Sequence, residues 1–308
     1  MIRRIELEVL ATVDRGDTIS ELATKLDHSD SYLSRAVGDL VEKGLVYTEH
    51  DGRRKRVVPS DARVVELYQD LVRQHSHIDF PDLVTGKALE VLYCLDHPRT
   101  VSEIADRTDN YRNTVNRVLK RLRDRGLVGT DDGQYEFNGD FHRLHEFARE
   151  LVHHLHRQQL QSVASRGTIL WEDHDEFLAQ TESEIEANHF HETGLARFAA
   201  FGLQFLLTRH RYYLYSEGVE TVSAVELCCH TLLIDDGPRY RSYCLLLLSH
   251  VDVDEDVLQE QAEKYGLEDK IDSLLRYLET HGKVDADRLP EWDEFQELAA
   301  DYEVDLPS

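Results

Sequence analysis

The fold is decided by a stretch that occurs twice in the chain: residues 18–46 read TISELATKLDHSDSYLSRAVGDLVEKGLV, and residues 100–128 read TVSEIADRTDNYRNTVNRVLKRLRDRGLV. The two stretches align without a gap at an offset of 82 residues, and ten of the 29 aligned positions are identical. Most of the other positions that a core requires stay apolar. A match at a fixed offset indicates a duplicated structural unit. Two copies of one supersecondary motif are therefore predicted.

Each copy opens with a helix-starting pattern. Thr18 with Glu21, and Thr100 with Glu103, fit the S/T-x-x-E capping box. In this box the threonine oxygen and the glutamate carboxylate accept hydrogen bonds from amides that the first helical turn leaves unpaired. Apolar residues at helical spacing follow. A short helix is predicted at each site.

A longer helix is predicted after a polar break, at residues 27–30 in the first copy and 109–112 in the second. It ends at Gly44 or Gly126, a residue type that suits a left-handed helix cap. The predicted apolar face consists of Leu33, Val37, Leu40 and Val41 in the first copy, and of Val115, Leu119 and Leu122 in the second. Each copy thus contains a helix, a tight turn and a second helix.

A short strand pair is predicted after each long helix. Asp51-Gly52 and Asp131-Asp132-Gly133 supply the turns, with strand-like residues on both sides. Further helices are expected over residues 2–14, 61–75, 85–95 and 141–164. The predicted fold is mainly α with small β wings. It consists of two tandem winged-helix domains, residues 1–78 and 79–166, followed by an acidic α-helical C-terminal domain, residues 167–308.

This arrangement resembles the winged helix-turn-helix domains of archaeal transcription regulators that are related to the MarR and ArsR families. The resemblance covers about residues 1–140 and rests on the capping boxes, the EKGLV and DRGLV helix endings and the Asp-Gly turns. It implies that the second helix of each motif enters the major groove and that the wing touches the backbone or the minor groove. Double-stranded DNA is the implied partner, and transcription regulation is the implied function.

The net charge of −25 argues at first against a nucleic-acid partner. The distribution of the charge removes this objection, because residues 1–166 carry 25 Lys and Arg against 28 Asp and Glu, whereas residues 167–308 carry 10 against 32. Lys is scarce, with 8 residues against 27 Arg. The composition resembles that of proteins from salt-loving archaea, in which a carboxylate-rich surface is an adaptation to the solvent. We favour this interpretation over a dedicated basic partner.

The long helix of the second copy carries the strongest candidate DNA-binding face. That face consists of Arg112, Asn113, Asn116, Arg117, Lys120 and Arg121. Asn can pair with adenine, Arg with guanine, and both Lys and Arg with phosphate. Residues 107–125 hold seven basic side chains against two acidic ones, in a chain that is short of positive charge. The alternative is a solvated, arginine-rich face on an ordinary packing helix.

In the first copy the predicted DNA-contacting residues lie on both the helix and the wing. Its helix offers Ser31, Tyr32, Ser34 and Arg35, with Asp30 and Asp39 close by. Its wing carries Arg53, Arg54, Lys55 and Arg56 directly after the turn. Four adjacent cations are costly without a counter-charge, so contact with phosphate or the minor groove is predicted. The alternative is partial pairing with Glu49 and Asp51, and the second wing, with Asp131 and Asp132, should contribute little.

Residues 167–308 are predicted to form successive amphipathic helices with one strand, Arg211 to Tyr215. Groups of potential ligands occur at His153, His154 and His156, at His189 and His191, at Cys228, Cys229 and His230, and at Asp252, Asp254 and Asp256. None has the well-spaced ligand set that zinc requires, and no nucleophile elbow, P-loop or dinucleotide motif occurs. No cofactor, metal site or enzymatic activity is therefore predicted. The four cysteines are expected to be buried, reduced thiols.

The sequence also predicts a cytoplasmic protein without a membrane segment. No apolar run approaches the roughly 20 residues that a membrane-spanning helix needs. The chain starts with an amphipathic helix pattern instead of a signal peptide.

The acidic C-terminal domain is expected to mediate dimerisation or to bind a partner protein. The order of parts is similar to that of AbiEi-type antitoxins, which repress their own promoter and neutralise a nucleotidyltransferase toxin. This resemblance rests on the general layout and on residues 212–233. A sequence-specific transcription regulator is the leading hypothesis, and an antitoxin-like protein that binds a toxin and autoregulates its promoter is the alternative.

Overall fold

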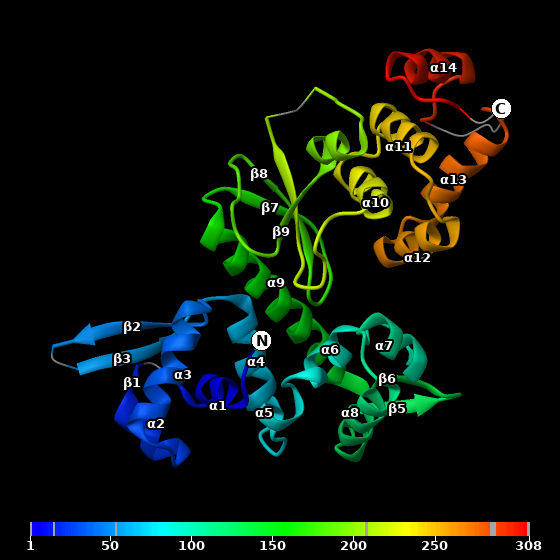
Figure 1. The fold of residues 1–308 in the computed structure, drawn as a ribbon. Helices are drawn as coiled ribbons and strands as arrows, with labels where there is room; N and C mark the ends of the chain where they lie inside the picture. Colours follow the sequence, from blue (N-terminus) through cyan, green and yellow to red (C-terminus); the bar gives the residue numbers. More distant parts are fainter. Residues whose placement is uncertain (1, 15, 53, 207–208, 284–287, 307–308) are drawn as a thin grey trace. The chain divides into compact units, whose positions relative to one another are not determined.

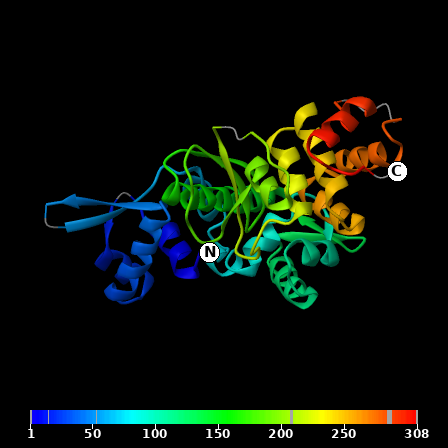
Figure 2. The ribbon, with the colours of Figure 1, turned by 45° about the horizontal axis from the view of Figure 1, so that its top comes forward.

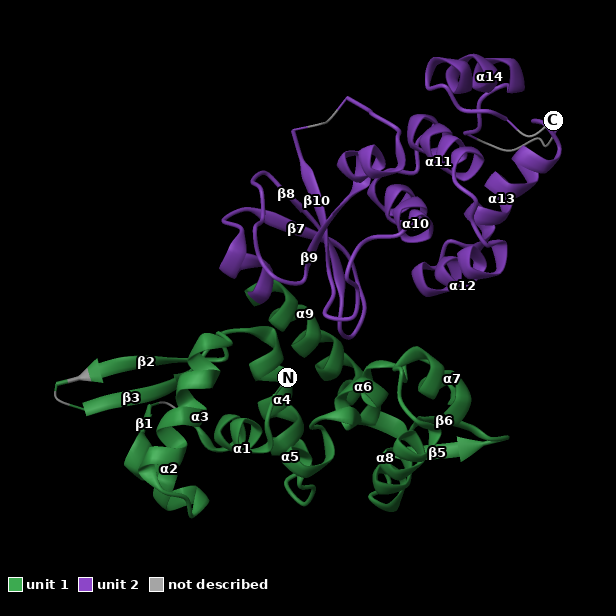
Figure 3. Cartoon of the chain, viewed as in Figure 1, with its two compact units in different colours: residues 1–158 green, residues 159–308 purple. Residues whose placement is uncertain are grey.

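The computed structural model describes residues 2–14, 16–52, 54–206, 209–283 and 288–306. The chain forms two compact units, unit 1 with residues 1–158 and unit 2 with residues 159–308 (Figure 3). The expected domain limits at residues 78/79 and 166/167 stay predictions. In this size range each unit is large enough to hold a core of its own.

The first copy of the duplicated motif has three helices and a three-stranded antiparallel sheet of order β1-β3-β2 (Figure 1). Its elements are α1 (Arg4–Thr12), β1 (Asp17–Thr18), α2 (Ile19–Leu26), α3 (Asp30–Glu42), β2 (Val46–Asp51) and β3 (Arg54–Pro59). The helices α4 (Arg63–Gln74) and α5 (Phe80–Leu83) follow. The predicted helix-turn-helix and hairpin are confirmed, and the short strand β1 was not predicted.

The second copy repeats this order of elements. It consists of α6 (Lys87–Tyr93), β4 (Arg99–Thr100), α7 (Val101–Arg107), α8 (Arg112–Asp124), β5 (Val128–Asp131) and β6 (Gln134–Phe137), with the sheet order β4-β6-β5. Helices α3 and α8 each span 13 residues. Both begin at the positions that the sequence alignment pairs, so the repeat in sequence is a repeat in structure.

The capping boxes are formed in both copies. The Thr18 amide donates to Glu21 Oε2 at 2.7 Å, and the Glu21 amide donates to Thr18 Oγ1 at 3.3 Å. The Thr100 amide donates to Glu103 at 2.6 Å, and the Glu103 amide donates to Thr100 at 3.3 Å. These hydrogen bonds lower the pKa of both glutamates. Each box fixes the start of the helix that leads into the turn.

A continuous hydrophobic core joins the two copies within unit 1. The 3-10 turn Gly139–His142 leads into α9 (Arg143–Val163), which contributes Phe147 to this core, 5.1 Å from the ring of Tyr68 in α4. His145 donates to the Leu92 carbonyl of the second copy at 3.2 Å. His154 donates to the Lys43 carbonyl at the end of α3 at 2.7 Å. Helix α9 therefore contacts both copies.

Unit 2 combines an antiparallel four-stranded sheet with five α-helices and a 3-10 helix among its described residues. The sheet has the order β7-β8-β10-β9, with β7 (Gly167–Glu172), β8 (Phe177–Thr181), β9 (Phe190–Thr193) and β10 (Arg211–Tyr215). The 3-10 helix η2 spans Gly194–Phe201. The α-helices are α10 (Ala224–Ile234), α11 (Pro238–His250), α12 (Glu255–Tyr265), α13 (Glu268–Glu279) and α14 (Trp292–Asp301).

The expectation of a helical third domain holds for the described residues between 224 and 301 and needs correction for those between 167 and 215. The strand at Arg211–Tyr215 is confirmed, but it is one of four. Strand β8 was missed because four of its five residues are buried, which removes the polar-apolar alternation of a half-exposed strand. Across the described ranges of the chain, no helix combines the length and apolar composition that crossing a bilayer requires.

Candidate nucleic-acid interface

Helix α8 separates its two faces cleanly. Val115, Val118, Leu119 and Leu122 are buried in the core of unit 1. The residues predicted to touch DNA are all exposed, namely Arg112, Asn113, Asn116, Arg117, Lys120 and Arg121. The helical period brings them to the solvent side of α8 because the apolar residues occupy the other side. The structure thus brings the six predicted residues together on one helix face, which we call the α8 face.

The cations of the α8 face are not paired with carboxylates of the described chain, although Asp124 stands four residues after Lys120. Among the described residues, none forms an ion pair or a side-chain hydrogen bond with any of its six members. Arg117 and Arg121 stand four residues apart, and Arg117 and Lys120 three apart. Like charges at these spacings destabilise a helix by roughly 0.2–0.5 kcal/mol for each pair. An external polyanion would remove this repulsion.

Several cations elsewhere in unit 1 are paired with carboxylates. Lys43 binds Glu6 at 2.7 Å, and Arg63 binds Glu146 at 2.7 Å. Arg73 binds Asp70 at 2.8 Å. Carboxylates thus serve as partners elsewhere in unit 1, whereas none of the described ones pairs with the α8 face.

Helix α3 of the first copy presents a smaller polar face. Ser31, Tyr32, Ser34 and Arg35 are exposed, as predicted for groups that would touch DNA. Arg35 donates from Nε to the Ser31 carbonyl at 3.4 Å, and the Tyr32 ring lies 5.2 Å from the ring of His28. Asp39 pairs with Arg3, so one of the two acidic charges near this face is neutralised.

One apolar position of α3 was assigned to the wrong side. Val41 was predicted to face the core, but it is 41% exposed. Ala36 lies in the core instead, together with Leu33, Val37 and Leu40. Val41 directly follows Leu40, and a turn of 100° per residue carries its side chain past the edge of the apolar stripe.

The hairpin of β2 and β3 forms an arm that reaches away from the helices of the first copy (Figure 2). Its register places Glu49 opposite Arg56 and His50 opposite Lys55. Arg54 and Lys55 are exposed, and within the described part of the chain neither forms an ion pair. Arg53, also predicted to touch DNA, lies outside the described residues. Two described cations of the predicted cluster are thus available on the arm.

Arg56 differs from its neighbours in the wing. It is half-buried, and its Nη1 donates to the Gly16 carbonyl at 2.6 Å, next to the short strand β1. Gly16 has a φ of +101°, and a Cβ there would lie 3.2 Å from Arg56 Cδ. The side chain of Arg56 therefore holds the wing against the body of the first copy, a role that the sequence did not indicate.

Tyr111 is an exposed residue of the second copy that was not among the residues predicted to touch DNA. It occupies the N-cap position of α8 and is 87% exposed. Its side chain makes no capping hydrogen bond, and tyrosine is not among the residues that N-cap positions favour. The alignment places Ser29, a preferred capping type, at the equivalent position of the first copy. The tyrosine in place of a serine at this aligned position was the one sign in the sequence that could have pointed to Tyr111.

Several of the potential ligand groups of unit 2 have structural partners. His230 is buried between Thr193 Oγ1 and the Tyr265 hydroxyl, at 2.9 Å from each, and burial lowers its pKa to about 3. Asp254 caps α12 by accepting from the Asp256 amide at 3.0 Å. The four cysteines all lie among the described residues, and they are buried thiols outside any disulfide. Among the described residues, no three His, Cys, Asp or Glu side chains are grouped so that they could hold a metal ion.

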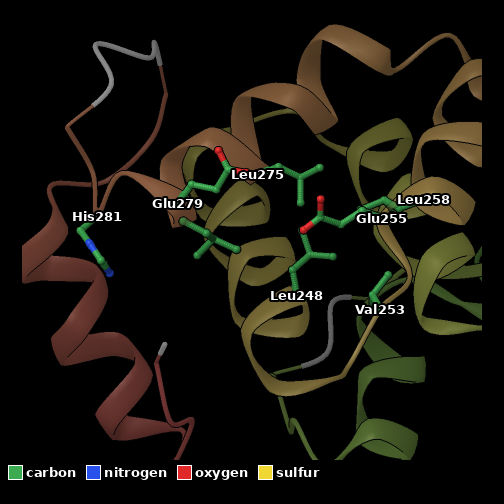
Figure 4. Close-up of a pocket in the computed structure, with 8 residues that line it drawn as sticks. Leu248, Val253, Glu255, Leu258, Leu275, Glu279 and His281 are labelled. Carbon is green, nitrogen blue, oxygen red and sulfur yellow. The ribbon is translucent and has the colours of Figure 1, made fainter. Parts of the chain in front are cut away.

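A cavity of about 340 Å³ lies between α11, α12 and α13 of unit 2 (Figure 4). It is lined by Leu248, Val253, Leu258, Leu275 and Leu278, with Glu255, Glu279 and His281. Glu255 belongs to the first turn of α12, where a carboxylate favours the helix by its interaction with the helix dipole. Glu255 thus has a structural reason and does not by itself indicate a ligand.

Two family models match parts of the chain. Residues 3–56 are similar to the MarR family. This MarR-like segment runs from the start of α1 to Arg56 in β3, so it contains α3 and most of the first wing. Residues 187–304 match the model HVO_2833_C, described as a C-terminal domain, which covers β9 to α14 of unit 2. None of the curated proteins matches the chain.

Proposed function

We propose that the chain is a sequence-specific, DNA-binding transcription regulator that uses two winged helices in tandem. The observation that carries the proposal is the α8 face, where four cations and two amides are exposed without an internal partner among the described residues. The MarR-like segment at residues 3–56 supports the same function for the first copy. The geometry offers binding groups, and we therefore propose a binding protein and not an enzyme.

The side chains of the α8 face divide into two chemical classes. Asn113, Asn116 and Arg117 can form hydrogen bonds with base edges, asparagine with adenine and arginine with guanine. Arg112, Lys120 and Arg121 supply the charge that phosphates attract. We therefore assign base reading to the first class and positioning on the duplex to the second.

The first copy is proposed to bind mainly through its wing. Arg54 and Lys55 stand on the arm formed by β2 and β3, where they can contact phosphates or the minor groove. Arg53 is proposed to act with them. Ser31, Tyr32, Ser34 and Arg35 of α3 would add hydrogen bonds to the duplex, while Arg56 holds the wing in place.

Unit 2 is proposed to mediate dimerisation or to bind a partner protein. It has its own hydrophobic core, and a separate family model matches residues 187–304. Both features fit a module added to the DNA-binding unit. A second protein that co-purifies with the chain in a stoichiometric amount would favour the antitoxin-like alternative.

The proposal is tested by selecting bound duplexes from a random DNA library with the full chain. We expect an enriched sequence that binds more tightly than its scrambled counterpart, in titrations at low and at molar KCl. Asn116→Ala is expected to weaken binding to the enriched duplex by roughly 1–3 kcal/mol. Arg73→Ala, an exposed arginine of α4 paired with Asp70, is the control and should bind like the wild type. A chain that enriches no sequence would contradict the proposal.

A further inference from the structure

Tyr111 is displayed on a rigid support at the start of α8. Asn110, the residue before it, donates from its side chain to Glu90 at 2.8 Å and to the Thr108 carbonyl at 3.0 Å. The Tyr111 carbonyl accepts from the Thr114 amide at 2.7 Å and from the Val115 amide at 3.2 Å. The backbone is thus held on both sides of the residue while the ring is 87% exposed.

The structure gives the Tyr111 ring no internal role within the described residues. The ring lies outside the hydrophobic core of unit 1, and the side chain does not cap α8. A large exposed aromatic side chain on a fixed backbone is a frequent anchor for a binding partner, because little conformational entropy is lost when it is covered. A partner that covers the ring must approach the N-terminal end of α8.

The N-terminal residues of a recognition helix are those that meet base edges in the major groove. Tyr111 directly precedes Arg112 and Asn113 of the α8 face. The major-groove edges of the bases carry hydrogen-bonding groups and a single apolar group, the C5-methyl of thymine. The aromatic ring of Tyr111, at the N-terminal end of α8, therefore has one apolar group of the bases to contact, the thymine methyl group.

We infer that Tyr111 is a specificity-determining residue that packs its ring against the methyl group of a thymine next to the bases read by the α8 face. The inference rests on the proposed function and adds a base identity to it. The phenolic hydroxyl is not required for this contact. It remains free to bind water or a phosphate oxygen.

The test replaces each thymine of the selected duplex, one at a time, with deoxyuridine, which lacks only the methyl group. With the wild-type chain, one thymine of the selected duplex is expected to give about a fourfold loss of affinity, the value for burying one methyl group. Tyr111→Phe should keep this difference between thymine and deoxyuridine. Tyr111→Ser should abolish it by binding both duplexes equally.

Tyr111→Ser also controls for the start of the helix. Serine is a favoured N-cap residue, and Ser29 at the N-cap of α3 starts a helix of the same length without a side-chain capping bond, so α8 should not be destabilised. Thermal unfolding of the variant checks this. If the wild type selects a sequence but tolerates every deoxyuridine, the inference is wrong and the proposed function stands. A Tyr111→Ser variant that still discriminates the two duplexes also overturns the inference, and a wild type that selects no sequence overturns the proposed function itself.

Discussion

Helices α3 and α8 occupy aligned positions in the two copies, have the same length and bury equivalent faces, yet their exposed faces differ. On α8 the cations have no partner among the described residues, whereas on α3 the arginine bonds to its own helix and an aspartate pairs with Arg3. For the wings the first copy is the more basic one, because Arg54, Lys55 and Arg56 stand on the first wing and Asp131 and Asp132 on the second. The duplication thus conserved the scaffold and placed the proposed DNA-binding chemistry on a helix in one copy and on a wing in the other.

The largest effect is expected where the scaffolds themselves differ. Glu6 in α1 is fully buried, binds Lys43 at 2.7 Å and accepts from the Arg3 amide at 2.7 Å. The aligned residue of the second copy is Ala88. Glu6→Gln should destabilise the first copy by about 3 kcal/mol, because the buried carboxylate loses its charge-assisted hydrogen bonds from Arg3 and Lys43. Hydrogen exchange should rise in α1 and α3 and stay unchanged in α8.

Glu42→Gln provides the control for that experiment. Glu42 is exposed on α3, and the described part of the chain contains no ion pair to it. Its replacement should change stability by less than about 0.5 kcal/mol. Equal exchange profiles for the Glu6 and Glu42 variants would show that the buried carboxylate does not hold the first copy together.

The next largest effect is a difference in DNA affinity between substitutions on α8 and on α3. Arg117 and Arg35 are aligned residues of α8 and α3. Arg35 donates to the Ser31 carbonyl of its own helix, whereas Arg117 has no partner among the described residues. Arg117→Ala should weaken binding to the selected duplex by about 2 kcal/mol, the range for a bidentate contact with a base. Arg35→Ala should weaken binding less, by about 1 kcal/mol, the net value of a single hydrogen bond. Fluorescence anisotropy titrations measure both, and equal losses would refute the proposed division of labour.

The wings should differ in salt dependence more than in specificity. Replacing both Arg54 and Lys55 with Ala should reduce the slope of log affinity against log salt by about one for each residue, since each would release a counterion. The loss should be similar for selected and scrambled duplexes. Gln134→Ala in the second wing should leave the slope unchanged. A loss confined to the selected duplex would mean that the first wing reads bases.

The capping boxes should show the smallest effect and the same one in both copies. Thr18→Ala and Thr100→Ala each remove a hydrogen bond at a helix start, so each should destabilise its own copy by about 1 kcal/mol. Hydrogen exchange of α2 and α7 reports the two losses separately. Clearly unequal losses of stability would show that the two capping boxes do not contribute equally to the starts of α2 and α7.

The same boxes give a pH dependence with a definite sign. The hydrogen bonds from the Thr18 and Thr100 amides lower the pKa of Glu21 and Glu103 from the usual 4.5. The stabilisation is therefore present above pH 4.5 and is lost as the pH falls through the lowered pKa values of the folded state. Titrating both carboxyls by NMR should give values below those of an unstructured peptide. Ordinary values in either copy would contradict the box there.

The duplicated part of the fold could be predicted from the sequence because its determinants are local. Capping boxes, helical spacing of apolar residues and glycine at helix ends act within a few residues, and all of them recur 82 positions later. The sheet of unit 2 could not be predicted in the same way. Its strands pair across long separations, as in the register of Tyr212 with Thr193 and of Tyr213 with Ala179, and β8 lacks alternation.

The candidate site was predictable in composition but not in detail. The charges of the α8 face can be read directly from the sequence. The role of Arg56 depends on Gly16, which lies 40 residues earlier, and only the folded chain shows that hydrogen bond. The display of Tyr111 depends on the hydrogen bond between Asn110 and Glu90. Both features arise from tertiary contacts that leave no pattern in the neighbouring sequence.

Helix α9 begins in one core and ends in another. Leu144, Phe147 and Leu151 belong to the core of unit 1, whereas Leu160 and the following Ala164 pack with Phe177 and Tyr213 of unit 2. The unit limit at residue 158 falls inside the helix, so no loop offers a protease an easy cleavage site there. A fragment that starts at residue 167 would lack Leu160 and expose the sheet it covers. Separate production of unit 2 should therefore start within α9, before Leu160.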